Sequence, residues 1–306
     1  MKFPAIFLAF GIAIAVSLPA HADVLKIQKV DEGIWALVGP LEQRNLANLG
    51  NNATFGLIET SEGAVLIDPG GSRLGAAMID DAIQAVTEQP VRFVINTGGQ
   101  DHRWLGNAYW QAKGAKVIAA AEAVDDQKER FSIQMTMLSQ LIEEGLEGTV
   151  AAYADITFDD AYTLEIGGKM LEIYHPASAH TPGDSFVWLE ESKTVFTGDI
   201  VYIGRILGVM EFSNTAEWID AFEAIEALNP EHLVPGHGPA TDMKTARADT
   251  YEYLQNLRSQ ISKHIDAGGG IIGSVSVDQS GFSHLDQFDA LAGRNAQAVF
   301  EQMEWE

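Results

Sequence analysis

The sequence predicts one α/β domain in which two β-rich halves and their outer helices form an αββα four-layer sandwich. Strand patterns fill the first part of the chain, and they resume after a long helical stretch. At 46% hydrophobic and 20% charged residues over 306 positions, the chain can build a large core. No composition shift marks a linker before Gly268-Gly269-Gly270. We therefore expect one domain over residues 23–267 and a C-terminal appendix over residues 268–306.

Residues 1–22 are typical of a secretory signal peptide. Lys2 supplies a positive charge, residues 6–18 are apolar, and Ala20-His21-Ala22 is a small-x-small cleavage pattern. An uncleaved anchor is the alternative, but the apolar run is short for a membrane span. We expect cleavage after Ala22, a periplasmic or secreted location, and no stable membrane insertion afterwards.

Residue periodicity predicts the order of the strands and helices. Apolar and polar residues alternate around the turns Asp31-Glu32-Gly33 and Ser61-Glu62-Gly63, which is typical of hairpins. Strands are expected at residues 24–30, 34–38, 53–59, 64–68, 91–96, 116–120, 162–166, 170–174, 185–189, 194–196 and 232–234. Helical spacing of apolar residues predicts helices at 76–86, 107–112, 121–146, 216–228 and 241–265.

The charge and the cysteine content exclude several classes of function. The chain carries 43 acidic and 19 basic residues, a formal charge of −24, so a nucleic-acid partner is disfavoured by repulsion. It has no cysteine, which excludes disulfides, thiolate zinc sites and cysteine nucleophiles. Nucleic-acid binding and thiol chemistry are therefore not expected.

Histidines and aspartates stand in loops beside the predicted strands. His102 follows Asp101 after one strand, His180 precedes another, and His237 and Asp199 each follow a strand end. Imidazole and carboxylate groups are the usual ligands of zinc in a protein without cysteine. The neighbouring glycines and prolines allow the sharp turns that would aim these side chains inward. The pattern predicts a metal site.

Five motifs in this order resemble those of the metallo-β-lactamase superfamily. They are VLIDPG at 65–70, VINT at 94–97, HTPGD at 180–184, FTGD at 196–199 and VPGHG at 234–238. The resemblance covers residues 53–239. It implies the αββα sandwich, with metals bound at the loop edge between the two sheets.

The first metal motif departs from the family pattern. The family has Thr-His-x-His-x-Asp-His followed by Gly-Asn, whereas here Gly98 and Gln100 stand in the places of the first two histidines. One alignment, with a compensated gap, keeps the family Asp-His pair as Asp101-His102. A gapless alignment puts His102 in the place of the Asp and Arg103 in that of the last His. We prefer the gapped alignment, because it keeps a carboxylate and an imidazole together.

The resemblance implies which metal ligands remain. Of the family's three-His site only His180 is left, while the second site keeps Asp101, His102 and His237, with Asp199 in the bridging position. This favours one zinc ion over two. Substituting His for both Gly98 and Gln100 should then raise the zinc content toward two ions.

The resemblance favours a zinc-dependent hydrolase of small molecules. Zinc would acidify a water that attacks an ester, lactone, thioester or amide. We expect Asp101 to act as the catalytic proton acceptor and Arg103 to bind an anionic group of the substrate. An Asp in the place of Asp199 resembles the thioesterase, lactonase and phosphodiesterase branches. The alternative is a non-catalytic member that binds a ligand or partner. The substrate and the oligomeric state stay open.

Overall fold

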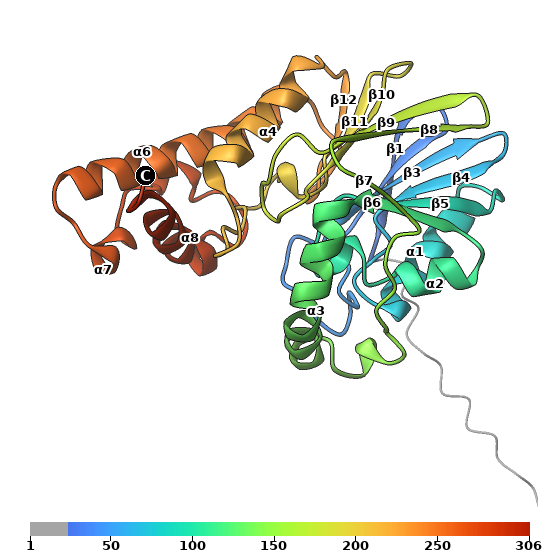
Figure 1. Cartoon of the computed structure of the whole chain (residues 1–306), viewed down its shortest axis with the longest axis horizontal. Coiled ribbons are helices and arrows are strands. Elements are labelled where there is room, and N and C mark those ends of the chain that lie inside the picture. The colour runs from blue at the N-terminus through green and yellow to red at the C-terminus, as the bar shows by residue number, and fades with distance from the viewer. Residues whose placement is uncertain (1–23) are drawn as a thin grey trace, which may run out of the picture.

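Two β-sheets lie face to face in the computed structural model, which describes residues 24–306 (Figure 1). Helices cover the outer face of each sheet, so the predicted αββα sandwich is confirmed. The predicted signal peptide, residues 1–22, lies outside the described residues.

The first sheet has seven strands, and they follow one another in chain order. They are β1 (Lys26–Asp31), β2 (Ile34–Val38), β3 (Thr54–Thr60), β4 (Gly63–Ile67), β5 (Val91–Asn96), β6 (Lys116–Ala120) and β7 (Ile156–Phe158). Neighbours from β1 to β4 are antiparallel, and those from β4 to β7 are parallel. The carboxyl ends of β4 and β5 therefore point to the same edge.

The second sheet has five strands in the order β12-β11-β10-β9-β8. They are β8 (Ala161–Ile166), β9 (Lys169–Tyr174), β10 (Phe186–Leu189), β11 (Thr194–Phe196) and β12 (His232–Val234). Only β11 and β12 run parallel, joined by the crossover through α4 (Thr215–Ala227). Their carboxyl ends also share one edge.

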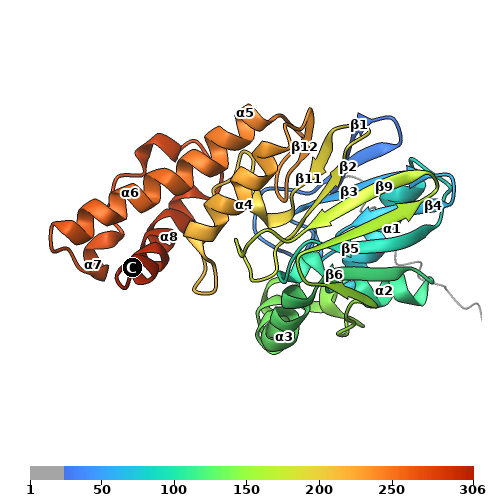
Figure 2. The ribbon, with the colours of Figure 1, turned by 45° about the horizontal axis from the view of Figure 1, so that its top comes forward.

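Three hydrophobic clusters define the layers. Between the sheets, Ile58 and Ile95 of the first pack with Ile173 and Val187 of the second. The other face of the first sheet is covered by α1 (Arg73–Gln84) and α2 (Asn107–Ala112), while α3 (Ala121–Leu141) flanks this side near β6 and β7 (Figure 2). The other face of the second sheet is covered by α4 and α6 (Glu252–Asp266).

The C-terminal helices extend to one side of the sheets in Figure 1. They are α5 (Met243–Ala246), α6, α7 (Ile271–Ser274) and α8 (Phe288–Met303). Residues 268–306 share one hydrophobic cluster with α4, α6 and the second sheet. Buried Asn295 of α8 also donates to Leu207 O at 2.8 Å and accepts from Val209 N at 2.9 Å. The domain boundary at residue 267 stays a prediction. Within residues 24–306, no helix is both long and apolar enough to cross a membrane.

Several elements differ from the sequence expectation, among them the helix expected over 121–146, strand β7, and helices α7 and α8, which were not expected. The helix expected over 121–146 ends at Leu141, because Ile142 leaves the helical conformation and is buried beside Trp104 and Leu138. Strand β7 was not expected, since three residues are too few to show an alternating pattern.

Candidate metal centre

The candidate site lies where strands of both sheets end. Four polar side chains follow the ends of β4, β5, β11 and β12, namely Asp68, Thr97, Asp199 and His237. Two backbone hydrogen bonds join the sheets here, from Thr54 N to Gly236 O at 2.7 Å and from Ser185 N to Thr97 O at 2.8 Å. Gly236 cannot carry a side chain, because a β-carbon would overlap the carbonyl oxygen of Gly198. The polar groups are thus held on a rigid frame.

His102, Asp199 and His237 form a compact buried cluster. One ligand atom from each lies within 4.8 Å of the other two, and their side chains are at most 2% exposed. Nε2 of His102 is 3.2 Å from Asp199 Oδ2, and Nε2 of His237 is 3.2 Å from Asp199 Oδ1. Two imidazoles and one carboxylate fit zinc, and three protein ligands with an open position are typical of catalytic sites.

The electrostatics of the cluster favour binding of a cation. Burial would raise the pKa of Asp199, but Arg103 and His102 hold it well below its ordinary value, so the side chain is a carboxylate. Burial lowers the pKa of His237, so its imidazole is neutral. Nδ1 of His237 is buried and has no hydrogen-bond partner among the described residues. A neutral imidazole and an ionised carboxylate are the forms that bind metal.

Asp101 lies beside this cluster but is not part of it. Its Oδ1 accepts from Arg44 at 2.5 Å and is 3.1 Å from Nδ1 of His102. Burial would raise the pKa of Asp101, but Arg44 and His102 lower it below its ordinary value. Metal-binding histidines commonly donate their second N–H to a carboxylate. The structure thus places Asp101 where it can orient His102.

His180 is also outside the three-residue cluster. Its Nδ1 is 2.8 Å from the carbonyl oxygen of Gly208, so Nδ1 carries the proton and Nε2 has a lone pair. Burial lowers its pKa from 6.5 to about 4, although Asp199 opposes the shift. His180 is therefore neutral at pH 7.

The buried His180 predicts a pH-dependent stability. Between about pH 4 and pH 6.5 the unfolded chain binds a proton that the folded chain does not, so stability falls as the pH falls through this window. The expected loss from His180 is about 3 kcal/mol. Urea unfolding of chelator-treated protein at pH 4.5 and pH 7 should show a smaller difference for His180→Gln than for wild type. The exposed-site variant His284→Gln should behave like wild type; an equal difference in His180→Gln would contradict the prediction.

Arg103 is fully buried behind the cluster. Its guanidinium donates to Asp68 at 2.7 Å, to Asp199 at 2.7 Å and to the carbonyl oxygens of Thr54 and Gly236. Burial opposes its charge, but Asp199 and Asp68 raise its pKa above the ordinary value. Because the Arg103 side chain is fully buried, no part of it is exposed to contact a substrate. The gapped and the gapless alignment both put His102 in the place of a metal ligand, so the choice between them stays a prediction.

The place of the first missing histidine, Gly98, is closed. A β-carbon at Gly98 would overlap Oδ1 of Asp184, which also accepts from Thr181 Oγ1. Gln100 Oε1 accepts from Arg130 at 3.3 Å, and Arg130 pairs with Asp126 on the same helix. The structure therefore leaves no room beside Asp184 for an imidazole at position 98 without a local shift.

Three charged residues near the cluster were not assigned roles from the sequence. Asp68 is part of the VLIDPG motif, and its φ of 66°, unusual for a non-glycine residue, marks a constrained position. Arg44 and Arg205 lie in loops without a recognisable motif, so no sequence pattern could have found them.

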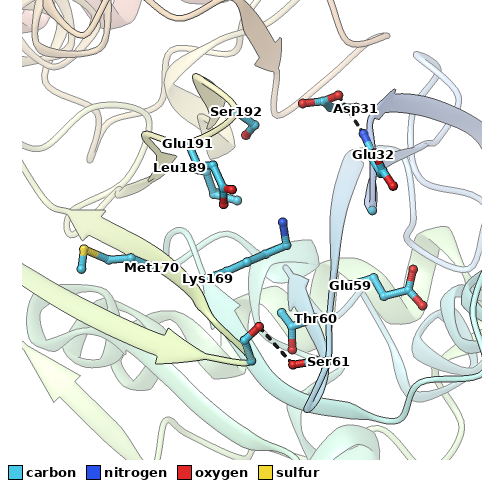
Figure 3. Close-up of a pocket in the computed structure, with 12 residues that line it drawn as sticks. Asp31, Glu32, Glu59, Thr60, Ser61, Lys169, Met170, Leu189, Glu191 and Ser192 are labelled. Atoms are coloured by element: carbon cyan, nitrogen blue, oxygen red, sulfur yellow. Dashed lines mark hydrogen bonds between the residues drawn. The ribbon is translucent and has the colours of Figure 1, made fainter.

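A separate cavity of about 630 Å³ opens at the other end of the sheets (Figure 3). β3 runs from Thr54, beside the cluster, to Thr60, which lines this cavity. Its charged lining is mainly acidic, with Lys169 among Asp31, Glu32, Glu59 and Glu191. None of its twelve lining residues is a histidine. It has no part in the candidate metal centre.

Comparison with known proteins identifies the family. The model of the Metallo-beta-lactamase superfamily matches residues 50–237. The human protein Acyl-coenzyme A thioesterase MBLAC2 is 23% identical over 215 residues, which are 64% of this chain and 76% of that protein.

Solved structures share the fold. A metallo-beta-lactamase from Pontibacter korlensis has a TM-score of 0.62 and 23% identity, over 76% of this chain and 99% of that chain. The stereoselective inverting sec-alkylsulfatase Pisa1 from Pseudomonas sp. has a TM-score of 0.69 and 17% identity, over 91% of this chain and 50% of that chain.

Proposed function

Because the chain belongs to the metallo-beta-lactamase superfamily, a family of hydrolases, we propose that it hydrolyses a small molecule with one zinc ion held by His102, Asp199 and His237. The buried cluster of these three side chains carries the proposal. When bound, zinc supplies Lewis acidity, which acidifies a water and polarises a carbonyl oxygen. Three ligands, rather than four, leave an open position for such chemistry.

The residues around the cluster prepare it for this role. Asp101 orients the His102 ring through Nδ1, and Arg103 neutralises part of the charge on Asp199. His180 holds its proton at Nδ1, so Nε2 is a hydrogen-bond acceptor. A thioester is the first substrate class to test, because a relative of this chain is named an acyl-coenzyme A thioesterase.

The experiment combines zinc analysis with hydrolysis of a panel of thioesters, lactones and esters. We expect close to one zinc per chain, and loss of most zinc and of activity in His102→Ala, Asp199→Ala and His237→Ala. Asp101→Asn should weaken zinc affinity by about 10- to 100-fold without abolishing it, as expected for a residue that orients a ligand. His284→Ala, an exposed histidine, is the control and should keep both zinc and activity.

Two outcomes would contradict the proposal. Wild-type protein without zinc at saturating zinc concentration would refute the metal centre. Protein with zinc but without turnover of any ester, lactone, thioester or amide would favour the alternative function, a non-catalytic binding protein. The loss of the family's His-x-His pair, with Gly98 and Gln100 in its places and Gly98 closed by Asp184, is the observation that favours this alternative.

We also propose that the chain is exported, because residues 1–22 have the charge, apolar run and cleavage pattern of a signal peptide. Expression in a secreting host should give a mature protein that begins at Asp23. Intact-mass measurement checks this, and soluble exported protein that retains Met1 would contradict it.

A further inference from the structure

Three apolar side chains form an exposed row on helix α3. Ile133, Met137 and Leu141 are 58%, 49% and 38% exposed, and they follow one another at intervals of four residues. Side chains four positions apart lie on the same face of a helix, one above the other. From its first to its last residue this α3 row is about 12 Å long, because each residue adds 1.5 Å along the helix axis.

The part of α3 that carries the row has no charged side chain. Residues 131–141 contain no Asp, Glu, Lys or Arg, although the net charge of the chain is −24. Residues 122–130 of the same helix, in contrast, are rich in charged side chains. A helix face that meets only water normally carries polar and charged groups. The α3 row therefore indicates a surface that contacts an apolar group.

Arg130 connects the α3 row to the candidate metal centre. It precedes Ile133 by three positions and Met137 by seven, so it lies on the same face of the helix. Its Nη1 donates to Gln100 Oε1 at 3.3 Å. The row therefore begins about one helical turn from the contact with the loop that carries the cluster residue His102.

Aromatic rings continue this contact to the cluster. The guanidinium carbon of Arg130 lies 4.0 Å from the centre of the Phe212 ring. The centre of the His180 ring is 6.4 Å from that of Phe212 and 6.0 Å from that of Tyr202. Tyr202 in turn stacks on the His237 ring, with the ring centres 4.4 Å apart. A continuous series of side chains therefore joins this face of α3 to the cluster.

The other end of the α3 row lies near the segment between β2 and β3. Gly145 follows Leu141 by four positions, and a β-carbon on it would lie 3.5 Å from Cδ1 of Leu46. Leu46 is itself 40% exposed. Arg44, two positions earlier, has a terminal nitrogen 3.0 Å from Nδ1 of His102. Exposed apolar side chains therefore border the candidate site from two segments of the chain.

The size of the α3 row favours a small ligand over a protein partner. A stable protein interface takes about 20–30 residues from each side, far more than this row provides. The net charge of −24 also opposes the association of two copies of the chain. A single hydrocarbon chain needs only a narrow apolar surface of this kind.

We propose that the α3 row binds a hydrocarbon chain of the substrate while the reacting group of the substrate lies at the His102–Asp199–His237 cluster. Each methylene group that the row covers is removed from water, which stabilises the complex. The substrate is then an ester or thioester with a straight aliphatic chain. This inference rests on the proposed function, because it names the substrate class of the same site.

The first test measures binding of hydrocarbon without any reaction. Straight-chain alcohols from 1-butanol to 1-decanol are titrated below their solubility limits and followed by saturation-transfer NMR. The affinity of wild type should rise about twofold for each added methylene group, because a chain on an open row buries about half of its surface. The double variant Ile133→Gln with Met137→Gln should bind 1-decanol at least fivefold more weakly.

The variants are designed to stay folded. The two substituted side chains of the double variant are exposed and Gln is a good helix former, so the melting temperature should stay close to that of wild type. The control Ile272→Gln removes an isoleucine of α7 that is also exposed, and it should bind 1-decanol like wild type.

Other occupants of the α3 row give a different result. Equal affinities of wild type and the double variant for 1-decanol overturn the proposal. Light scattering then shows whether the row is a contact between two copies, since wild type but not the double variant would be a dimer. Flotation with phosphatidylcholine vesicles shows whether it contacts a membrane, since wild type but not the double variant would float.

Kinetics separates this inference from the proposed function. In a series from acetyl to decanoyl of whichever ester or thioester is hydrolysed, kcat/KM of wild type and of Ile272→Gln should rise with chain length. The ratio of the decanoyl to the acetyl kcat/KM should be at least fivefold lower in the double variant. If no compound is turned over, the proposed function fails, and the alcohol titration still decides whether the row binds hydrocarbon. If compounds are turned over with the same chain-length dependence in wild type and the double variant, the inference fails alone.

Discussion

Arg103→Met should destabilise the protein more than any other single substitution at the site. The substitution leaves Asp68 and Asp199 buried without the cation that lies 2.7 Å from each. Breaking a buried ion pair by removing one partner costs about 3–5 kcal/mol. Urea unfolding at neutral pH measures the loss, and soluble yield reports it if the variant does not refold.

Matched variants distinguish charge from packing. Arg294→Met makes the same chemical change at an exposed position and should alter stability by less than about 0.5 kcal/mol. Adding Asp68→Asn to Arg103→Met should recover part of the loss, because one of the two uncompensated charges is then removed. A loss below about 1 kcal/mol in Arg103→Met would show that this ion pair is not what holds the strand ends together.

Gly98→Ala should destabilise the protein although its backbone suits any residue. Gly98 has no positive φ, so the strain comes from overlap of the new β-carbon with Oδ1 of Asp184. Overpacking of this kind costs about 1–3 kcal/mol. For the same reason, His at both 98 and 100 is no longer expected to raise the zinc content to two ions, which changes the expectation from sequence alone.

A double-mutant cycle with Asp184→Ala tests the origin of this cost. Asp184→Ala alone removes the acceptor of two Thr181 hydrogen bonds and should also be destabilising. The double variant should lose less stability than the sum of the single losses, because the smaller side chain makes room for the β-carbon. Additive losses would indicate that Asp184 is not the obstacle. A rise to two zinc ions in the double His variant would contradict the closed geometry.

The sequence predicts the fold well because short-range patterns determine it. The hairpin turns at Gly33 and Gly63 fix the antiparallel start of the first sheet, and the loop motifs mark where parallel strands end. Parallel strands place their ends at one edge, so the meeting of Asp199 and His237 follows from strand order. Strand β7 and helices α7 and α8 show a weaker periodicity of apolar residues, so the sequence did not predict them.

The local details of the site could not be predicted in the same way. Asp101 and His102 are adjacent in sequence, and only the turn Asp101–Arg103 decides which of them faces Asp199. Arg103 and Asp68 are 35 positions apart, and Arg205 and Leu41 are 164 apart, so their contacts depend on the folded chain. The assignment of metal ligands and of Asp101 as a catalytic group stays a prediction.

The hydrogen bonds of Asn295 link helix α8 to the loop whose carbonyl group contacts His180. Asn295 holds Leu207 and Val209, the two neighbours of Gly208, and the Gly208 carbonyl determines which nitrogen of His180 carries the proton. A premature stop codon that removes only α8 would leave every cluster residue encoded and still release this loop. A variant that lacks α8 would therefore change the surroundings of His180 without changing any residue of the cluster.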